Sequence, residues 1–139
     1  MDRQKLRQQL ERHEGKRSKA YMDHLGNVTV GIGRNLTGKG LSEDEIHWLL
    51  DNDIDECVAD LETFPWWRDL DEVRQRAVCD LRFNLGPTRF RTFTRLMRGL
   101  ATGDFALAGR SAEESLWYRQ VKTRGPRIVH MLRTGTDPT

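Results

Sequence analysis

The chain has 139 residues, of which 32% are charged and 37% are apolar, and its formal net charge is +2. This composition is typical of a globular protein that is large enough to bury a core of its own. It contains no run of 18 apolar residues, which excludes a membrane-spanning segment. The charged stretch 1–14 also lacks the apolar region of a signal peptide, so we expect synthesis in the cytoplasm.

The charge is distributed unevenly along the chain. Residues 1–73 carry 10 basic and 16 acidic side chains, whereas residues 74–139 carry 13 basic and 5 acidic ones. A basic surface of this kind favours an anionic partner such as nucleic acid, an acidic cell-wall polymer or a membrane surface. A solvated helical surface would explain the same charges, and both interpretations stay open.

The first third of the chain predicts a short helix followed by a hairpin. Leu6 and Leu10 are four residues apart in a charged segment, which predicts an amphipathic helix over 3–13. From 20 to 33 the pattern changes to alternation around a turn at Leu25-Gly26-Asn27, with Val28, Val30 and Ile32 on one side of a strand.

The remaining chain predicts helices only. Ser42 followed by Glu45 is a capping box, and an apolar period behind it predicts one long helix over 43–62. Further helices are expected at 70–84, 92–100, 104–112 and 125–133. The expected fold is therefore α+β and predominantly α-helical, with a small N-terminal lobe that carries a β-hairpin and is joined by the long helix to a helical C-terminal lobe.

Cysteines and tryptophans are expected to serve packing. Cys57 and Cys79 lie among helix-patterned apolar residues, which is typical of buried free thiols, and two cysteines do not make a zinc site. The aromatic side chains that could stack on a sugar are more simply explained as core residues; they are Trp48, Trp66, Trp67 and Trp117.

Three polar residues at the helix-to-hairpin junction suggest a specific chemistry. Glu14 is followed by Asp23 nine residues later and by Thr29 six residues further on. Hydrolysis of a glycosidic bond needs two carboxyl groups on opposite sides of the bond and a means of placing water. Each residue taken alone is ordinary, because most glutamates are surface carboxylates and threonine is common in strands. Their joint spacing indicates a glycoside hydrolase.

The spacing Glu-x8-Asp-x5-Thr with Gly-Ile-Gly directly after it resembles the T-even phage lysozyme family, glycoside hydrolase family 24. Four downstream segments are similar to that family's C-terminal lobe in the same order, namely 70–78, 83–86, 115–118 and 132–136. The resemblance implies a single lysozyme-like domain over 1–139. Its N-terminal lobe would cover about 12–60 and its C-terminal lobe about 61–139, with the first helix packing on the C-terminal lobe.

The resemblance also implies a function. Members cleave the β-1,4 bond between N-acetylmuramic acid and N-acetylglucosamine in peptidoglycan, need no metal or other cofactor, and commonly lyse the host at the end of phage infection. By this similarity Glu14 is the general acid, and Asp23 and Thr29 activate and position water. Glu14, at the end of a helix, would be the more buried acid, and Asp23 the more exposed one. We expect a monomer that binds peptidoglycan and no nucleic acid, is attracted to anionic envelope polymers, and reaches the wall through a separate pore.

Further site residues follow from the same resemblance. Phe83 and Asn84 are similar to substrate-cleft positions, although plain packing would also explain them. His13 stands where the family's best-studied member has an aspartate paired with the arginine that matches Arg124. We expect Asp80 to replace that aspartate as the partner of Arg124, so these three residues would support the site.

A second departure concerns the residue after the Gly-Ile-Gly segment. Arg34 stands where that member has a histidine paired with the aspartate that matches Asp53. An Arg34–Asp53 pair would be a permanently charged substitute that ties the hairpin to the long helix.

Two functions from other classes stay open. One is a catalytically inactive lysozyme fold that binds the cell wall, which the intact set of Glu14, Asp23 and Thr29 argues against. The other is an arginine-rich nucleic-acid-binding protein, which leaves the acids of the hairpin unexplained. Salt dependence of DNA binding would distinguish the latter.

Overall fold

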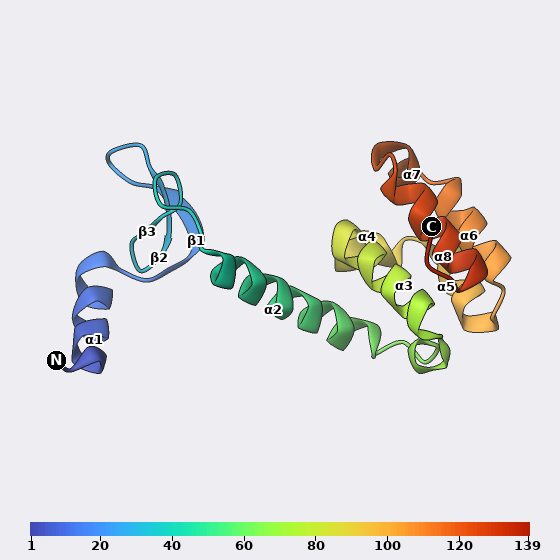
Figure 1. The fold of residues 1–139 in the computed structure, drawn as a ribbon, viewed down its shortest axis with the longest axis horizontal. Helices are drawn as coiled ribbons and strands as arrows, with labels where there is room; N and C mark the ends of the chain where they lie inside the picture. Colours follow the sequence, from blue (N-terminus) through green and yellow to red (C-terminus); the bar gives the residue numbers. More distant parts are fainter. The chain divides into compact units, whose positions relative to one another are not determined.

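The computed structural model describes residues 1–139, which divide into two compact units, Met1–Leu49 and Leu50–Thr139. The first unit contains one complete helix, a three-stranded sheet and the start of a second helix, and the second unit contains helices only, as Figure 1 shows. The prediction of a predominantly helical α+β fold is confirmed. None of the helices is both long enough and apolar enough to span a bilayer. How the first helix packs on the C-terminal lobe stays a prediction.

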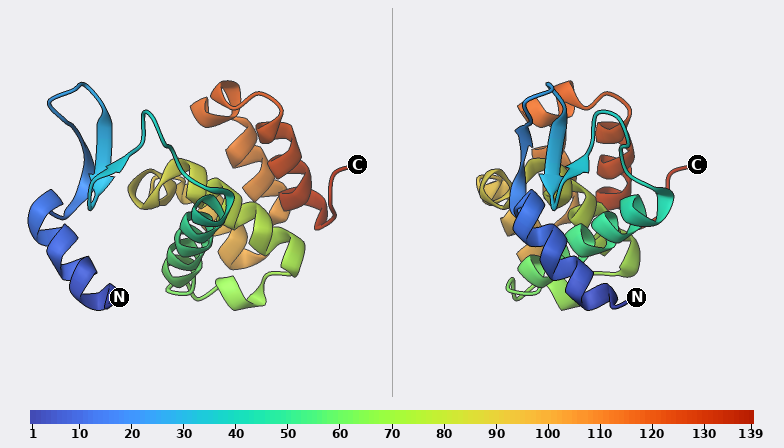
Figure 2. Two further views of the ribbon diagram at one scale, coloured as in Figure 1. Left: turned by 60° about the vertical axis from the view of Figure 1, so that its left-hand side comes forward. Right: turned by 90° about the vertical axis from the view of Figure 1, so that its left-hand side faces the viewer.

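The N-terminal unit begins with α1 (Arg3–Glu14), which Asp2 caps by accepting the backbone N–H of Lys5 at 3.0 Å. The sheet consists of β1 (Arg17–Met22), β2 (Val28–Gly31) and β3 (Arg34–Asn35), in that spatial order and antiparallel throughout. Both views in Figure 2 show α1 running directly into this sheet. The register of β1 against β2 shifts between Arg17 and Tyr21, so the bulge lies on the strand next to the end of α1.

The long helix α2 (Glu43–Leu61) starts at the predicted capping box. The N–H of Ser42 donates to Glu45 Oε1 at 2.9 Å, and the N–H of Glu45 donates to Ser42 Oγ at 3.2 Å. The helix begins in the first unit and ends in the second, where Cys57 and Leu61 are buried.

The helices of the C-terminal unit after α2 are α3 (Glu72–Leu85), α4 (Pro87–Arg91), α5 (Thr94–Thr102), α6 (Phe105–Glu113), α7 (Leu116–Gln120) and α8 (Arg124–Thr134). In this unit α8 packs on α3, α6 and α7, α6 also packs on α5, and α4 packs on α3. A short 3-10 turn at Trp67–Asp69 precedes α3. Trp66, Trp67 and Trp117 are buried in its core, as expected. The expectation is wrong for Trp48, which lies in the first unit, on the first turns of α2, and is 70% exposed.

Both cysteines are free, as predicted, with Cys57 buried and Cys79 half-buried. Burial, with Cys57 close by, raises the pKa of the Cys79 thiol to about 11, so it is an unreactive thiol at neutral pH.

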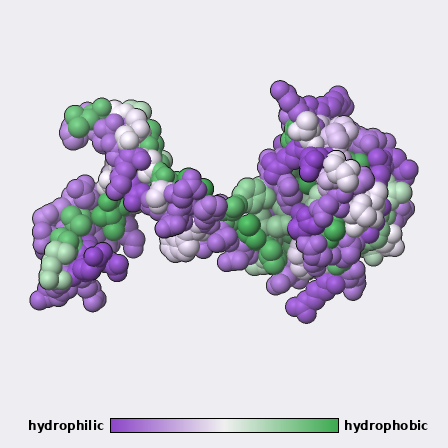
Figure 3. All heavy atoms as spheres, viewed as in Figure 1, coloured by the Kyte–Doolittle hydropathy of each residue, from purple (hydrophilic) through white to green (hydrophobic).

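The surface of the C-terminal unit is mainly hydrophilic on the face drawn in Figure 3. Many of its arginines are held in ion pairs, which are Arg74–Asp71, Arg76–Glu72, Arg76–Asp137, Arg82–Asp60, Arg91–Asp60, Arg95–Glu114, Arg124–Asp80 and Arg133–Glu113. The excess of basic residues in this part of the sequence is therefore partly neutralised within the fold. Arg74 also donates to the carbonyls of Leu132 at 2.7 Å and Arg133 at 2.8 Å, which satisfies the last turn of α8.

Candidate active site

Glu14 is the last residue of α1. The helix ends there because Gly15 follows with φ +78°, and the N–H of Gly15 closes the last turn on the carbonyl of Glu11 at 2.9 Å. The carboxyl group of Glu14 lies against the backbone of Gly33, since a Cβ built on Gly33 would be 2.8 Å from Glu14 Oε2. The expected burial of Glu14 is not found. Its side chain is exposed, because no residue of α1 is buried and a glycine covers little of a carboxyl group.

Asp23 follows the last residue of β1 and organises the hairpin turn. Its Oδ1 atom accepts the backbone N–H groups of Leu25 and Asn27, both at 2.9 Å. These bonds, that of Asn27 first, hold the pKa of the Asp23 carboxyl below its usual range. The group is therefore ionised at neutral pH, and its Oδ1 atom is fixed by the turn.

Thr29 lies on β2 opposite Tyr21, and it is only 5% exposed. Its hydroxyl donates to the carbonyl of Asn27 at 3.3 Å. The backbone of Asn27 therefore contacts both predicted water-handling residues, since its N–H binds Asp23 and its carbonyl binds Thr29. Because the Thr29 proton is used in this bond, the lone pairs of the hydroxyl oxygen are left to accept a hydrogen bond.

A mainly apolar pocket of about 950 Å³ lies in the same unit. Ile32, Leu41 and Trp48 contribute apolar surface, and Lys16 and Arg34 contribute positive charge. The exposed indole of Trp48 is available for stacking on the apolar face of a sugar ring. Such stacking is the alternative to core packing that the sequence left for this residue.

The partner of Arg34 is Glu45, so the expected pairing with Asp53 is wrong. Arg34 Nη1 donates to Glu45 Oε2 and also to the carbonyl of Gly40 at 3.4 Å. Glu45 is nearer because it lies in the first turn of α2, whereas Asp53 lies about two turns further along the helix. Hydrogen bonds from the Ser42 backbone and then from Arg34 lower the pKa of Glu45, so this pair is charged at neutral pH.

The other predicted residues lie on the C-terminal unit. Asp80 accepts Arg124 Nε at 2.7 Å, so the predicted pair is present. Asn84 Oδ1 accepts the indole N–H of Trp117 at 2.8 Å, which fixes the amide and leaves its NH₂ group free, and Phe83 is exposed beside it. Phe83, Asp80 and Arg124 line one pocket of about 340 Å³.

His13 lies exposed in the last turn of α1 and makes no side-chain hydrogen bond or ion pair. The structure contains no group of three or more histidine, cysteine, aspartate or glutamate side chains that could hold a metal ion.

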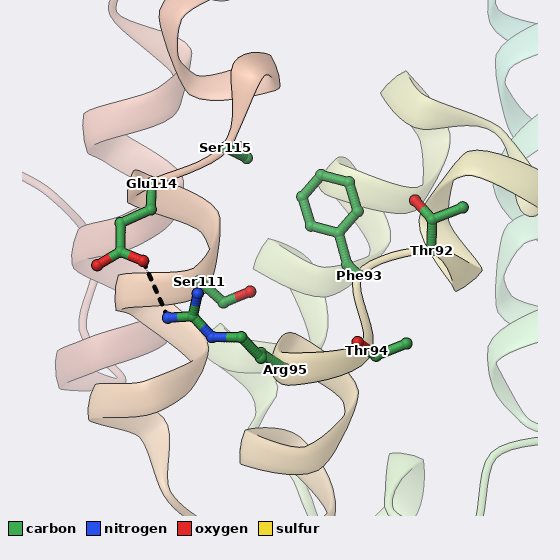
Figure 4. A pocket seen from close by; sticks show the side chains of 7 residues that line it. All are labelled: Thr92, Phe93, Thr94, Arg95, Ser111, Glu114 and Ser115. Atoms are coloured by element: carbon green, nitrogen blue, oxygen red, sulfur yellow. Dashed lines mark hydrogen bonds and ion pairs between the residues drawn. The ribbon is translucent and has the colours of Figure 1, made fainter.

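A separate polar pocket of about 270 Å³ lies in the C-terminal unit between the start of α5 and the end of α6 (Figure 4). Its charged groups, Arg95 and Glu114, bind each other at 2.9 Å. It contains none of the predicted site residues, and its charges are already satisfied.

Comparison with known proteins identifies the family of the chain. Residues 11–131 match the model of the phage lysozyme family. The chain is 36% identical over 124 residues to an endolysin of Acyrthosiphon pisum secondary endosymbiont phage 1, with 85% of this chain and 80% of that protein covered. It is 23% identical to probable T4-type lysozyme 1 of Dictyostelium discoideum, with 94% and 95% covered.

A third relative is the pre-baseplate central spike protein Gp5 of Enterobacteria phage T4, at 26% identity over 94% of this chain. The chain spans only 28% of the length of that spike protein. The match over 11–131 establishes that the chain belongs to the phage lysozyme family. It is accordingly a lysozyme-type glycoside hydrolase, as the motif resemblance predicted.

Three contributors to the site were not found from the sequence. The roles of Asn27 and Gly33 depend on backbone atoms, which side-chain patterns do not reveal. Glu45 was recognised as part of a capping box, but a cap uses only one carboxylate oxygen, and the second oxygen was available to a nearby cation. That free oxygen was the signal that could have identified the partner of Arg34.

Proposed function

We propose that the chain is a muramidase that cleaves the β-1,4 bond between N-acetylmuramic acid and N-acetylglucosamine of peptidoglycan. Glu14 is the general acid that protonates the leaving glycosidic oxygen, and Asp23 and Thr29 hold and activate the attacking water. The observation that carries this proposal is the double role of Asn27, whose backbone binds Asp23 through its N–H and Thr29 through its carbonyl.

The arrangement suits a nucleophilic water. Asp23 Oδ2 and Thr29 Oγ1 both present lone pairs, so each accepts one proton of the same water molecule and leaves the water lone pairs for attack on the anomeric carbon. The ionised Asp23 then removes a proton as the bond forms. The carboxyl group of Glu14 donates its own proton to the leaving glycosidic oxygen as the glycosidic bond breaks. It is the second of the two carboxyl groups that glycoside hydrolysis requires.

Substrate contacts beyond the reacting bond are proposed for Phe83 and Asn84. The free NH₂ group of Asn84 is held in position by the bond of its carbonyl oxygen to Trp117, so it can donate to a sugar N-acetyl oxygen. The exposed ring of Phe83 offers an apolar surface next to it. Asp80 and Arg124 support the site, and no cofactor takes part in the proposed chemistry.

The biological role proposed is that of a phage endolysin which acts on the host wall after release through a separate pore. The similarity to an endolysin over 80% of that protein supports this role more directly than the similarity to part of a spike protein. The exposed arginines outside ion pairs would attract the enzyme to anionic envelope polymers.

The test compares the wild-type protein with Glu14→Gln in the clearing of outer-membrane-permeabilised Gram-negative cells. Glu11→Gln is the matched control, since Glu11 lies one turn earlier on α1 and contacts only Lys16 at 4.0 Å. We expect clearing by the wild type and by Glu11→Gln but not by Glu14→Gln, with products that end in reducing N-acetylmuramic acid. Clearing by Glu14→Gln contradicts the assignment of the acid, and no clearing by any folded variant favours a wall-binding module.

A further inference from the structure

The side chain of Glu14 has an unusually close backbone neighbour. A Cβ at Gly33 would lie 2.8 Å from Glu14 Oε2, 3.1 Å from Cδ and 3.2 Å from Cγ. The outer half of the Glu14 side chain therefore occupies the space that a Cβ on residue 33 would need. A methyl group there would overlap the carboxyl group, and one of the two would have to move.

This contact distinguishes Gly33 from the other glycines of the N-terminal unit. Gly15, Gly26 and Gly31 also have positive φ angles, of +78°, +82° and +67°, but a Cβ on any of them would meet nothing within 4 Å. The φ of Gly33 is +70°, so its backbone conformation is like theirs. What sets it apart is the carboxyl group that rests on it.

The position of Gly33 is fixed by the residue that follows it. Arg34 pairs with Val30 across the sheet, and its guanidinium is bound by Glu45 and by the carbonyl of Gly40. Glu45 is itself tied to the start of α2 through Ser42. The Arg34–Glu45 ion pair thus holds the edge of the sheet that Glu14 touches.

We propose that Gly33 is a positioning residue for the general acid, and that the Arg34–Glu45 pair holds it in place. The inference rests on the proposed function, in which Glu14 donates a proton to the glycosidic oxygen. A glutamate side chain has several rotatable bonds, and because Glu14 is exposed, burial does not restrict their rotation. The flat surface of Gly33 limits the carboxyl group to directions in which it can reach the leaving oxygen.

The test compares Gly33→Ala with Gly31→Ala, both purified and shown to be folded by circular dichroism. The two variants share the strain of alanine at a positive φ, but only Gly33→Ala places a methyl group in the Glu14 carboxyl. With soluble peptidoglycan strands as substrate, we expect kcat of Gly33→Ala to fall by roughly 10- to 100-fold, as for a small misplacement of a catalytic group, with KM little changed. Gly31→Ala should keep the kcat of the wild type.

Two further readouts separate positioning from a general loss of structure. The alkaline limb of the kcat profile against pH should shift in Gly33→Ala and not in Gly31→Ala, because only the surroundings of Glu14 have changed. Glu45→Gln keeps the helix cap but removes the charge that holds Arg34, so it should lower kcat by a few-fold. Arg34→Lys, which keeps the charge, should retain more activity than Arg34→Ala.

Equal kcat values for Gly33→Ala and Gly31→Ala would overturn the inference. If Gly33→Ala does not fold, Glu45→Gln takes over as the deciding variant. An unchanged kcat in Glu45→Gln then overturns the inference, because loss of the ion pair that holds Gly33 would have no effect on the general acid. Glu14→Gln in the same series separates this inference from the proposed function. If Glu14→Gln is inactive and Gly33→Ala is fully active, only the positioning role of Gly33 is refuted. If Glu14→Gln is active, both the general-acid role of Glu14 and the positioning role of Gly33 are refuted.

Discussion

The carboxylate of Asp60 joins three helices of the C-terminal unit, and its removal should be costly. Asp60, near the end of α2, accepts Arg82 Nε of α3 at 2.9 Å and two nitrogens of Arg91 of α4 at 3.0 and 2.6 Å. The side chain of Arg82 is 8% exposed and that of Asp60 is 19% exposed. In Asp60→Ala the only remaining partner of the Arg82 guanidinium is Cys57 Sγ, at 3.3 Å.

The expected loss follows from the burial of Arg82. Removing one partner of a buried ion pair destabilises a protein by about 3–5 kcal/mol, because the other charge is left uncompensated. The side chain of Arg91 is half exposed, so water hydrates its guanidinium group when Asp60 is removed. The loss of the Arg91–Asp60 pair therefore contributes little to the loss of stability. We therefore expect Asp60→Ala to lower the free energy of unfolding by about 3 kcal/mol, at the lower end of that range. Asp60→Leu combined with Arg82→Met should recover most of this loss, because it removes both charges together.

Urea unfolding followed by tryptophan fluorescence measures this effect, since Trp66, Trp67 and Trp117 are buried in the same unit. The control is Glu114→Ala, which breaks the Arg95–Glu114 pair at 2.9 Å, whose side chains are 47% and 53% exposed. That exposed pair should contribute about 0–1 kcal/mol. If Asp60→Ala is no more destabilising than Glu114→Ala, the argument from burial is refuted.

Two other predictions concern carboxylates. Hydrogen bonds from Arg91, followed by those from Arg82, hold the pKa of Asp60 below its usual value. Its stabilisation is therefore complete above the unfolded pKa of about 3.9 and is lost as the pH falls towards the folded pKa. Unfolding curves from about pH 6 to 2 should converge for wild type and Asp60→Asn at the acid end. Asp80→Asn should change stability by less than about 1 kcal/mol, since the Arg124–Asp80 pair is partly exposed. Its main effect should be a lower rate of cell clearing, and an unchanged rate would contradict the supporting role of Asp80.

The elements with strong local signals were predicted from the sequence. The long helix has a capping box and an extended apolar period; it begins at the predicted residue and ends one residue before the predicted end. The helices α4 and α7 were not predicted, because each has only five residues and cannot show a helical period. The strand β3 has two residues and was missed for the same reason.

Side-chain partners were predicted unevenly. The Asp80–Arg124 pair, which was inferred from the family resemblance, was predicted correctly. The Arg34–Asp53 pair was wrong because the path of the loop before α2, which the sequence pattern does not give, decides which acid of the helix reaches Arg34. The exposure of Trp48 could not be deduced from period alone, since a helix that passes from one unit to another has no single buried face.

The packing of α3 on α8 has a consequence for synthesis of the chain. Arg74 at the start of α3 donates to the carbonyl of Leu132, 58 residues later. Until α8 has left the ribosome, Ala77, Val78 and Leu81 of α3 lack part of the core that buries them. The helical unit therefore completes its core only once α8 has emerged, and a truncated product that lacks α8 exposes apolar surface to proteases and chaperones.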